Sequence, residues 1–140
     1  SGISSLEYST DNGATWLAWT APVAFATTPA TVSYRATDQA GNTSAVGTVT
    51  IKGTLALATP TISGTVKVGK TVKAKVASFT AGATLTYQWN RNGAPIAGAT
   101  KSSYKLVKAD KAKKLTVTVT ATLTGFDALS KTSAAKTVKK

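Results

Sequence analysis

The chain of 140 residues contains no cysteine and no histidine, and it has only five carboxylates. Without thiols and imidazoles it has no cysteine nucleophile, no proton relay that titrates near neutral pH and no zinc site of the Cys/His type. A glycosidase needs two acids that face each other, and a serine nucleophile would need a lysine or a carboxylate as its base. We therefore expect a protein that is not an enzyme and that uses no cofactor.

Long apolar runs are also missing. No stretch approaches the ~20 apolar residues that span a bilayer, so we expect no membrane span. Residues 1–20 lack the charged-then-apolar layout of a signal peptide. The sequence begins with SGISSLEYS, which reads as the interior of a module, so we expect the chain to be a piece of a longer protein.

The sequence contains strand-forming patterns, whereas apolar residues do not recur with the period of a helix. Threonine, alanine, valine and serine dominate, and glycine or proline recurs every few residues, which is typical of an all-β protein. In LTVTVTATL (115–123) every second residue is apolar, so one face of that strand is expected to point inward. The same reasoning predicts core positions in three strands, at Tyr34, Tyr87, Trp89 and Val117.

Charge divides the chain. Residues 1–53 carry two basic residues against three acids, whereas residues 54–140 carry fifteen against two, a net charge of +13. Such different halves indicate two modules. We predict a first module at 1–53, a short and partly packed linker at 54–59, and a lysine-rich module at 60–140.

The first half resembles a known family. EYSTDNGATWLAWTAPV (7–23) and YRATDQAGNTSA (34–45) are similar to the hairpin and the strand–turn of bacterial immunoglobulin-like repeats from large exported, often actinobacterial, proteins. The resemblance covers most of residues 3–51 and implies a β-sandwich that lacks two strands at its start. Either the piece is truncated, or a neighbouring chain supplies a strand through self-association of this module.

The second half resembles another exported immunoglobulin-like repeat family, with the pattern P-x-I-x-G-x-x-x-V-G-x-T, then Y-Q-W, then G-x-x-I-x-G-A-T. The resemblance implies that Trp89 fills the centre of the sandwich. The family usually has glycine where this chain has Ala112, so a positive φ at that turn would be strained. The matching positions are Pro60, Ile62, Gly64, Val68, Gly69, Thr71, 87–89, Gly93, 96–100, Tyr104, Asp110 and 115–120.

Lysines are the first candidate ligand contacts. A strongly positive module attracts polyanions, although lysines also keep a surface hydrated and protect sheet edges. Lysine offers no bidentate geometry, so binding to an anionic cell-wall polymer or polysaccharide would be weak and sensitive to salt. Specific nucleic-acid binding is not expected, because aromatic residues are not interleaved with the basic ones. The candidates are Lys73, Lys75, Lys111, Lys113 and Lys114.

Two further sets of residues are candidates. Trp16 and Trp19 lie three apart on a predicted strand and therefore on opposite faces, so one of them could stack on a sugar ring; packing is the alternative. Asp11, Asp38 and Asn42 lie in oxygen-rich turns that could hold Ca²⁺. Three side chains are few for this ion, and hydrogen bonding within the turns is the alternative.

Together these features predict two tandem immunoglobulin-like β-sandwich modules, the first without its N-terminal strands. The expected function is that of a non-catalytic spacer, presentation and adhesion module in a larger exported bacterial protein, secreted or associated with the cell surface. The alternative is a carbohydrate-binding accessory module of a secreted polysaccharide hydrolase.

Overall fold

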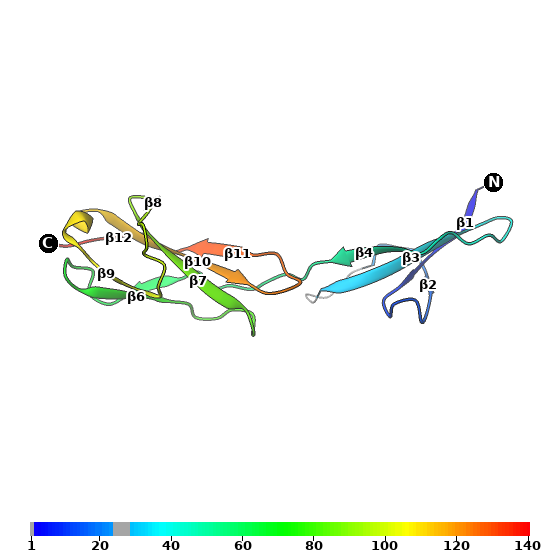
Figure 1. Cartoon of the computed structure of the whole chain (residues 1–140), viewed down its shortest axis with the longest axis horizontal. Coiled ribbons are helices and arrows are strands. Elements are labelled where there is room, and N and C mark those ends of the chain that lie inside the picture. The colour runs from blue at the N-terminus through cyan, green and yellow to red at the C-terminus, as the bar shows by residue number, and fades with distance from the viewer. Residues whose placement is uncertain (1, 24–28) are drawn as a thin grey trace. The chain divides into compact units, whose positions relative to one another are not determined.

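The computed structural model describes residues 2–23 and 29–140, in which the regular elements are β-strands and one 3₁₀ turn. The chain divides into two compact units, unit 1 (Ser1–Thr54) and unit 2 (Leu55–Lys140), shown in Figure 1. The segment expected as a linker contributes to unit 2. Leu55 and Leu57 are buried in its core, and the backbone of Leu57 bridges to Phe79.

Unit 1 is a four-stranded antiparallel sheet in the order β2-β1-β3-β4. Its first hairpin turns at Asn12 and Gly13, which both have positive φ, as residues of an Asn-Gly turn tolerate well. The sequence pattern also predicts strands at ATWLAW (14–19) and PVAFA (22–26). The first contains a strand of only two residues, and the second falls partly outside the described residues. The strands are β1 (Ile3–Ser9), β2 (Leu17–Ala18), β3 (Ala30–Asp38) and β4 (Gly47–Ile51).

The prediction that Tyr34 lies in a core is wrong, because its side chain is 44% exposed. Tyr34 shares a face of β3 with Val32, which is the one fully buried large apolar residue among those described in unit 1. No second sheet of unit 1 covers that face within the described residues. The ring instead lies across Gly47 of β4, where any Cβ would collide with it.

Unit 2 contains two antiparallel sheets. One has the order β11-β10-β7-β8, with β12 also paired to β10, and the other has the order β5-β6-β9. The strands are β5 (Thr61–Ser63), β6 (Thr71–Lys75), β7 (Thr84–Arg91), β8 (Ala94–Pro95), β9 (Ser103–Lys105), β10 (Lys114–Thr122), β11 (Leu129–Thr132) and β12 (Lys136–Thr137). A single apolar cluster contains Ile62 and Val72 from the smaller sheet and Trp89 and Leu115 from the larger one, so the sheets pack face to face.

The alternation predicted for β10 is confirmed. Its apolar residues from Leu115 to Ala121 are buried, and the intervening threonines lie on the outer face. There Thr118 and Thr120 form hydroxyl pairs with Thr132 and Ser130 of β11, at 2.8 and 2.7 Å. These cross-strand pairs stabilise the outer face without requiring apolar contacts.

Trp89 and Val117 lie in the core as predicted, both with no exposed surface, and they are directly opposite each other on β7 and β10. The indole Nε1 of Trp89 donates a hydrogen bond to the carbonyl of Lys101 at 2.9 Å, so the only polar atom of the side chain is satisfied. Tyr104 stacks on the ring with centroids 5.8 Å apart. Tyr87 is half-buried and packs against the same cluster.

Candidate functional site

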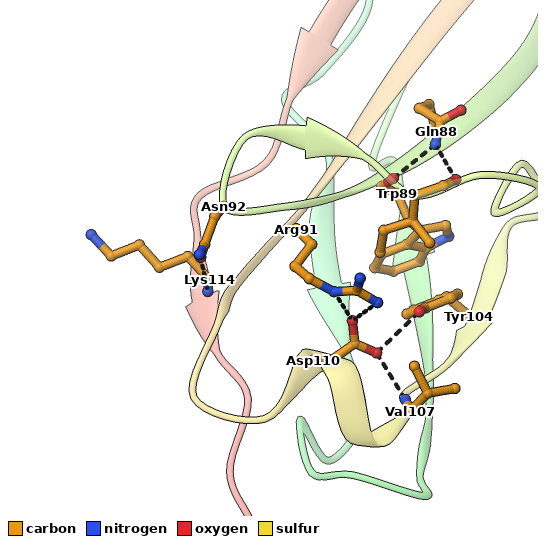
Figure 2. A network of polar contacts seen from close by, with 9 residues as sticks. Gln88, Trp89, Arg91, Asn92, Tyr104, Val107, Asp110 and Lys114 are labelled. Carbon is orange, nitrogen blue, oxygen red and sulfur yellow. Dashed lines mark hydrogen bonds and ion pairs between the residues drawn. The ribbon is translucent and has the colours of Figure 1, made fainter.

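Asp110, one of the five carboxylates, is a structural anchor. Asp110 has no exposed surface, and its Oδ1 accepts from Nε and pairs with Nη2 of Arg91, both at 2.6 Å. Its Oδ2 accepts from the Tyr104 hydroxyl at 3.0 Å and the Val107 N–H at 2.8 Å (Figure 2). Through these four contacts Asp110 ties the 3₁₀ turn η1 (Lys108–Asp110) to Arg91 and Tyr104. Both of its carboxylate oxygens are therefore already occupied.

The network also changes two proton affinities. The hydrogen bond and charge of Asp110 raise the pKa of Arg91 above its usual value. Burial, followed by the hydrogen bond to Asp110, raises the pKa of the Tyr104 hydroxyl. Both shifts keep the Arg91 guanidinium and the Tyr104 hydroxyl protonated at neutral pH.

The calcium candidates do not converge. Asp38 lies opposite Ile3 and Asp11 follows Ser9, so the two carboxylates are at opposite ends of the β1–β3 ladder, about 20 Å apart. Only Asp38 and Asn42 meet, through a 2.9 Å hydrogen bond from the Asn42 amide. Within residues 2–23 and 29–140, no three Asp or Glu side chains gather as metal ligands would.

Turn hydrogen bonds account for both acids instead. Asp11 accepts from the Ser9 hydroxyl, the Thr15 hydroxyl and the Thr15 N–H, and these bonds lower its pKa to about 2, with Ser9 the largest cause. Asp38 accepts from the side chain and backbone of Asn42 and from the Ala40 N–H, which lower its pKa. The carboxylates stabilise loops.

The two tryptophan candidates are separated onto opposite faces, as predicted from their spacing. The guanidinium of Arg35 lies 4.1 Å from the ring centroid of Trp16, and Arg35 also forms a 2.8 Å ion pair with Glu7. Trp19 is 45% exposed and meets the Tyr8 ring edge-on, with centroids 5.7 Å apart. One face of the Trp16 ring is therefore occupied, and Trp19 is the more open of the two.

The lysines of unit 2 are all exposed, and several of them form two groups. The first, which we call the lysine tip, surrounds an open hollow of about 400 Å³ lined by Val68, Lys108, Lys111 and Lys140. A parallel backbone bridge brings Lys67 beside Lys139, next to this hollow. Figure 1 shows the carboxyl terminus beside the 3₁₀ turn at this end of unit 2.

Neither aspartate side chain of unit 2 lines the hollow at the lysine tip. Asp110 lies beneath it but is buried and bonded to Arg91. The other acid, Asp127, follows the far end of β10, about 27 Å along the strand from Lys114. The positive potential at the tip therefore extends into solvent.

The second group, which we call the lysine face, lies on the outside of the β5-β6-β9 sheet. Lys73 and Lys75 alternate with inward-facing residues of β6, and Lys105 of β9 lies opposite Thr71 on the same side. The positions between these lysines on the lysine face carry small hydroxyl side chains, namely Thr61, Ser63, Thr71 and Ser103. The result is a flat cationic surface with hydroxyl groups between the charges.

Among the lysines selected from sequence, Lys73 and Lys75 lie on the lysine face and Lys111 lies at the lysine tip. Lys113 and Lys114 lie where β10 begins, next to β12, outside both groups. Sequence reasoning missed Lys105, Lys108 and Lys140. The alternation of β9 could have identified Lys105, but nothing local to Lys140 indicates that the chain end returns to η1.

No family model matches the chain, and no curated protein matches it at a significant level. In the part of the chain that the structure describes, no helix is long and apolar enough to cross a membrane.

Proposed function

We propose that the chain is a non-catalytic spacer and adhesion segment, made of two tandem immunoglobulin-like modules, from an exported bacterial protein of the cell surface. Unit 2 adheres to anionic surface polymers through its lysines. The motifs in residues 7–45 and 60–120, together with the all-β architecture, support the assignment to exported repeats.

The observation that carries the proposal is the uncompensated charge of unit 2. It carries fifteen basic residues and two acids, and the acid nearest the lysine tip is buried in an internal ion pair. An ordinary hydrated surface intersperses both signs of charge. A surface of a single sign instead attracts polyanions over a distance of about 8–10 Å at moderate salt.

The chemistry of lysine sets the kind of binding. An ammonium group on a flexible stem acts as a point charge, without the bidentate geometry that makes arginine specific for phosphate or carboxylate. Binding is therefore weak for each contact and gains strength from many contacts along one polymer. Such avidity suits a segment that attaches a larger protein to a charged wall.

The test is the salt dependence of binding to polyphosphate and to alginate, with neutral dextran as the control polymer. Affinity should fall linearly on a log–log plot, losing at least about tenfold between 50 and 200 mM salt. Binding that does not change with salt, or no binding to either polyanion at 50 mM salt, would overturn the proposal.

Three triple variants locate the site. Lysine-to-glutamine changes at Lys108, Lys111 and Lys140 remove the lysine tip, and those at Lys73, Lys75 and Lys105 remove the lysine face. Changes at Lys113, Lys114 and Lys131 remove the same charge elsewhere. Loss of contacts should reduce the salt slope by roughly one for each contacting lysine, so the first two variants should lose more than the third.

A second function is favoured by one observation, the 45% exposure of Trp19 beside Tyr8. A ring of this exposure could stack on a sugar, as in a carbohydrate-binding accessory module of a secreted hydrolase. Quenching of tryptophan fluorescence by a neutral polysaccharide, persisting at 0.5 M salt and absent in Trp19→Ala, would favour that function over lysine-mediated adhesion.

A further inference from the structure

One side of the unit 1 sheet carries large apolar side chains that remain half-exposed. Tyr8 of β1 lies opposite both Leu17 of β2 and Tyr34 of β3, which places all three on the same side. Strand alternation and the pairing register place Leu6, Trp19 and Val49 on this side as well. We call the half-exposed residues of this side the apolar face, namely Leu6, Leu17, Trp19, Tyr34 and Val49. Their exposed fractions lie between 44% and 52%.

The opposite side of the same sheet is polar. It carries the Glu7–Arg35 ion pair near its centre and the threonine pair Thr31 and Thr50 at the β3–β4 edge. A sheet with one polar and one apolar side is one layer of a sandwich, whose apolar side normally packs on a second sheet about 10 Å away. Unit 2 contains both layers, whereas the described part of unit 1 contains one.

We propose that the apolar face of unit 1 is a self-association surface, which pairs with the same face of a second copy so that each copy supplies the other's second layer. A two-fold axis makes such a contact self-complementary and closed, so it yields dimers and not filaments. This inference concerns unit 1 and does not depend on the function proposed for unit 2.

Charge favours a second copy of unit 1 over the other candidate surface of the same molecule. Apart from Asp38 at the end of β3, the apolar side of the sheet carries no charged residue, and unit 1 has a net charge of only −1, so two copies of it can approach with little repulsion. Docking on the lysine face of a neighbouring unit 2 would bury ammonium groups against Leu17 and Trp19 without partners, which costs several kcal/mol for each charge.

The area is sufficient for a weak dimer. Five side chains that are about half-exposed offer roughly 500 Å² of apolar surface per copy. Two copies would bury about 1,000 Å² in total, the lower limit for a specific interface. We therefore expect a dissociation constant on the order of 10 µM.

Dimerisation and binding to a polyanion should respond to salt in opposite directions. Each chain carries a net charge of +12, so two chains repel each other through unit 2 at low ionic strength. Raising the salt concentration screens that repulsion. Dimerisation should therefore tighten between 50 and 500 mM salt, over the same range in which binding to a polyanion weakens.

The test is sedimentation velocity of the 140-residue chain between 1 and 200 µM in 0.5 M salt, compared with two variants on one strand. Val49→Lys places a charge on the apolar face, whereas Thr50→Lys places the same charge on the polar side of β4. Leu17→Lys repeats the test on β2. Circular dichroism checks that each variant keeps its fold.

As the protein concentration increases, we expect the mean mass of the wild-type chain to rise from 14.3 kDa towards twice that value. The Thr50→Lys variant should show the same rise. Val49→Lys and Leu17→Lys should raise the dissociation constant at least about 100-fold, because a symmetric dimer would bury two unpaired ammonium groups in the contact. A wild-type chain that stays monomeric at 200 µM would overturn the proposal. Association that persists in both apolar-face variants would do the same, since it would place the contact elsewhere, such as a sheet edge.

Discussion

Unit 1 and unit 2 both contain strands of alternating character, yet they bury very different amounts of apolar surface. Twelve apolar residues form the buried core of unit 2, whereas Val32 is the one fully buried among the described large apolar residues of unit 1. The comparison shows that alternation determines which side of a strand is apolar. Whether that side is covered depends on a second layer, which lies elsewhere in the sequence or outside it.

The largest expected effect tests this contrast with one tryptophan from each unit. Trp89→Ala removes a ring with no exposed surface and should destabilise unit 2 by about 3–5 kcal/mol. Trp19→Ala removes a ring that is 45% exposed and should cost unit 1 about 1 kcal/mol or less at low protein concentration. Urea unfolding followed by circular dichroism measures both, and equal costs would remove the contrast.

The next effect compares an ion pair whose acid is fully buried with one whose acid is partly exposed. Asp110→Ala leaves Arg91 and the Val107 N–H without their partner beneath the core, and should destabilise unit 2 by about 3 kcal/mol or more. Glu7→Gln removes an ion pair whose side chains are 27–30% exposed, and should change unit 1 by less than about 1 kcal/mol. Thermal unfolding of the two variants gives the comparison, and a small loss for Asp110→Ala would show that the network in Figure 2 is not an anchor.

A smaller effect of opposite sign should come from Ala112. Its φ of +60° confirms the strain expected where the resembling family has glycine. Ala112→Gly should stabilise unit 2 by about 0.5–1 kcal/mol, whereas Ala109→Gly, one turn earlier, should stabilise nothing. A destabilised Ala112→Gly protein would mean that the methyl group contributes packing that outweighs the strain.

The smallest expected effect is a difference between the two units in how their stability depends on pH. Asp11, with a pKa of about 2, and Asp38 have folded pKa values below their unfolded ones, so their contribution to unit 1 is present above about pH 4 and is lost as pH falls through the folded values. Tyr104 has a raised folded pKa, so unit 2 loses stability as pH rises above about 10. Melting curves from pH 2 to 11 should show acid sensitivity in unit 1 that Asp11→Asn reduces. If the melting temperature of Asp11→Asn falls at low pH as much as that of the wild type, the carboxylate of Asp11 does not stabilise the loop.

Much of unit 2 could be predicted from sequence because its signals are local. Alternation indicated the inward positions of β10, and Asn92-Gly93, with positive φ at both residues, forms the kind of tight turn that an Asn-Gly pair favours. The exposure of Tyr34 could not be predicted, because it depends on whether a second layer covers this side of β3, and among the described residues of unit 1 none does. The lysine tip was equally hidden, since it forms where the chain end returns beside Lys67.

The same limit applies to the short segment before Pro60. Its glycine and small residues suggested a linker, yet Leu55 and Leu57 belong to the core of unit 2 and pair with the segment around Phe79. The two leucines at alternate positions predicted partial packing of this segment. They did not predict its place in the core of unit 2, because the segment that pairs with it lies more than twenty residues away.

The central claim is that unit 2 has a core between two packed sheets, whereas unit 1, in the residues that the structure describes, is a single sheet. Amide hydrogen exchange at about 1 µM, below the expected dimerisation, tests it most directly by comparing Val117 and Val119 of β10 with Tyr34 and Ala36 of β3. The account predicts that the β10 amides exchange at least about 100-fold more slowly, because they open only with global unfolding of unit 2. Equal protection in the two strands would contradict it.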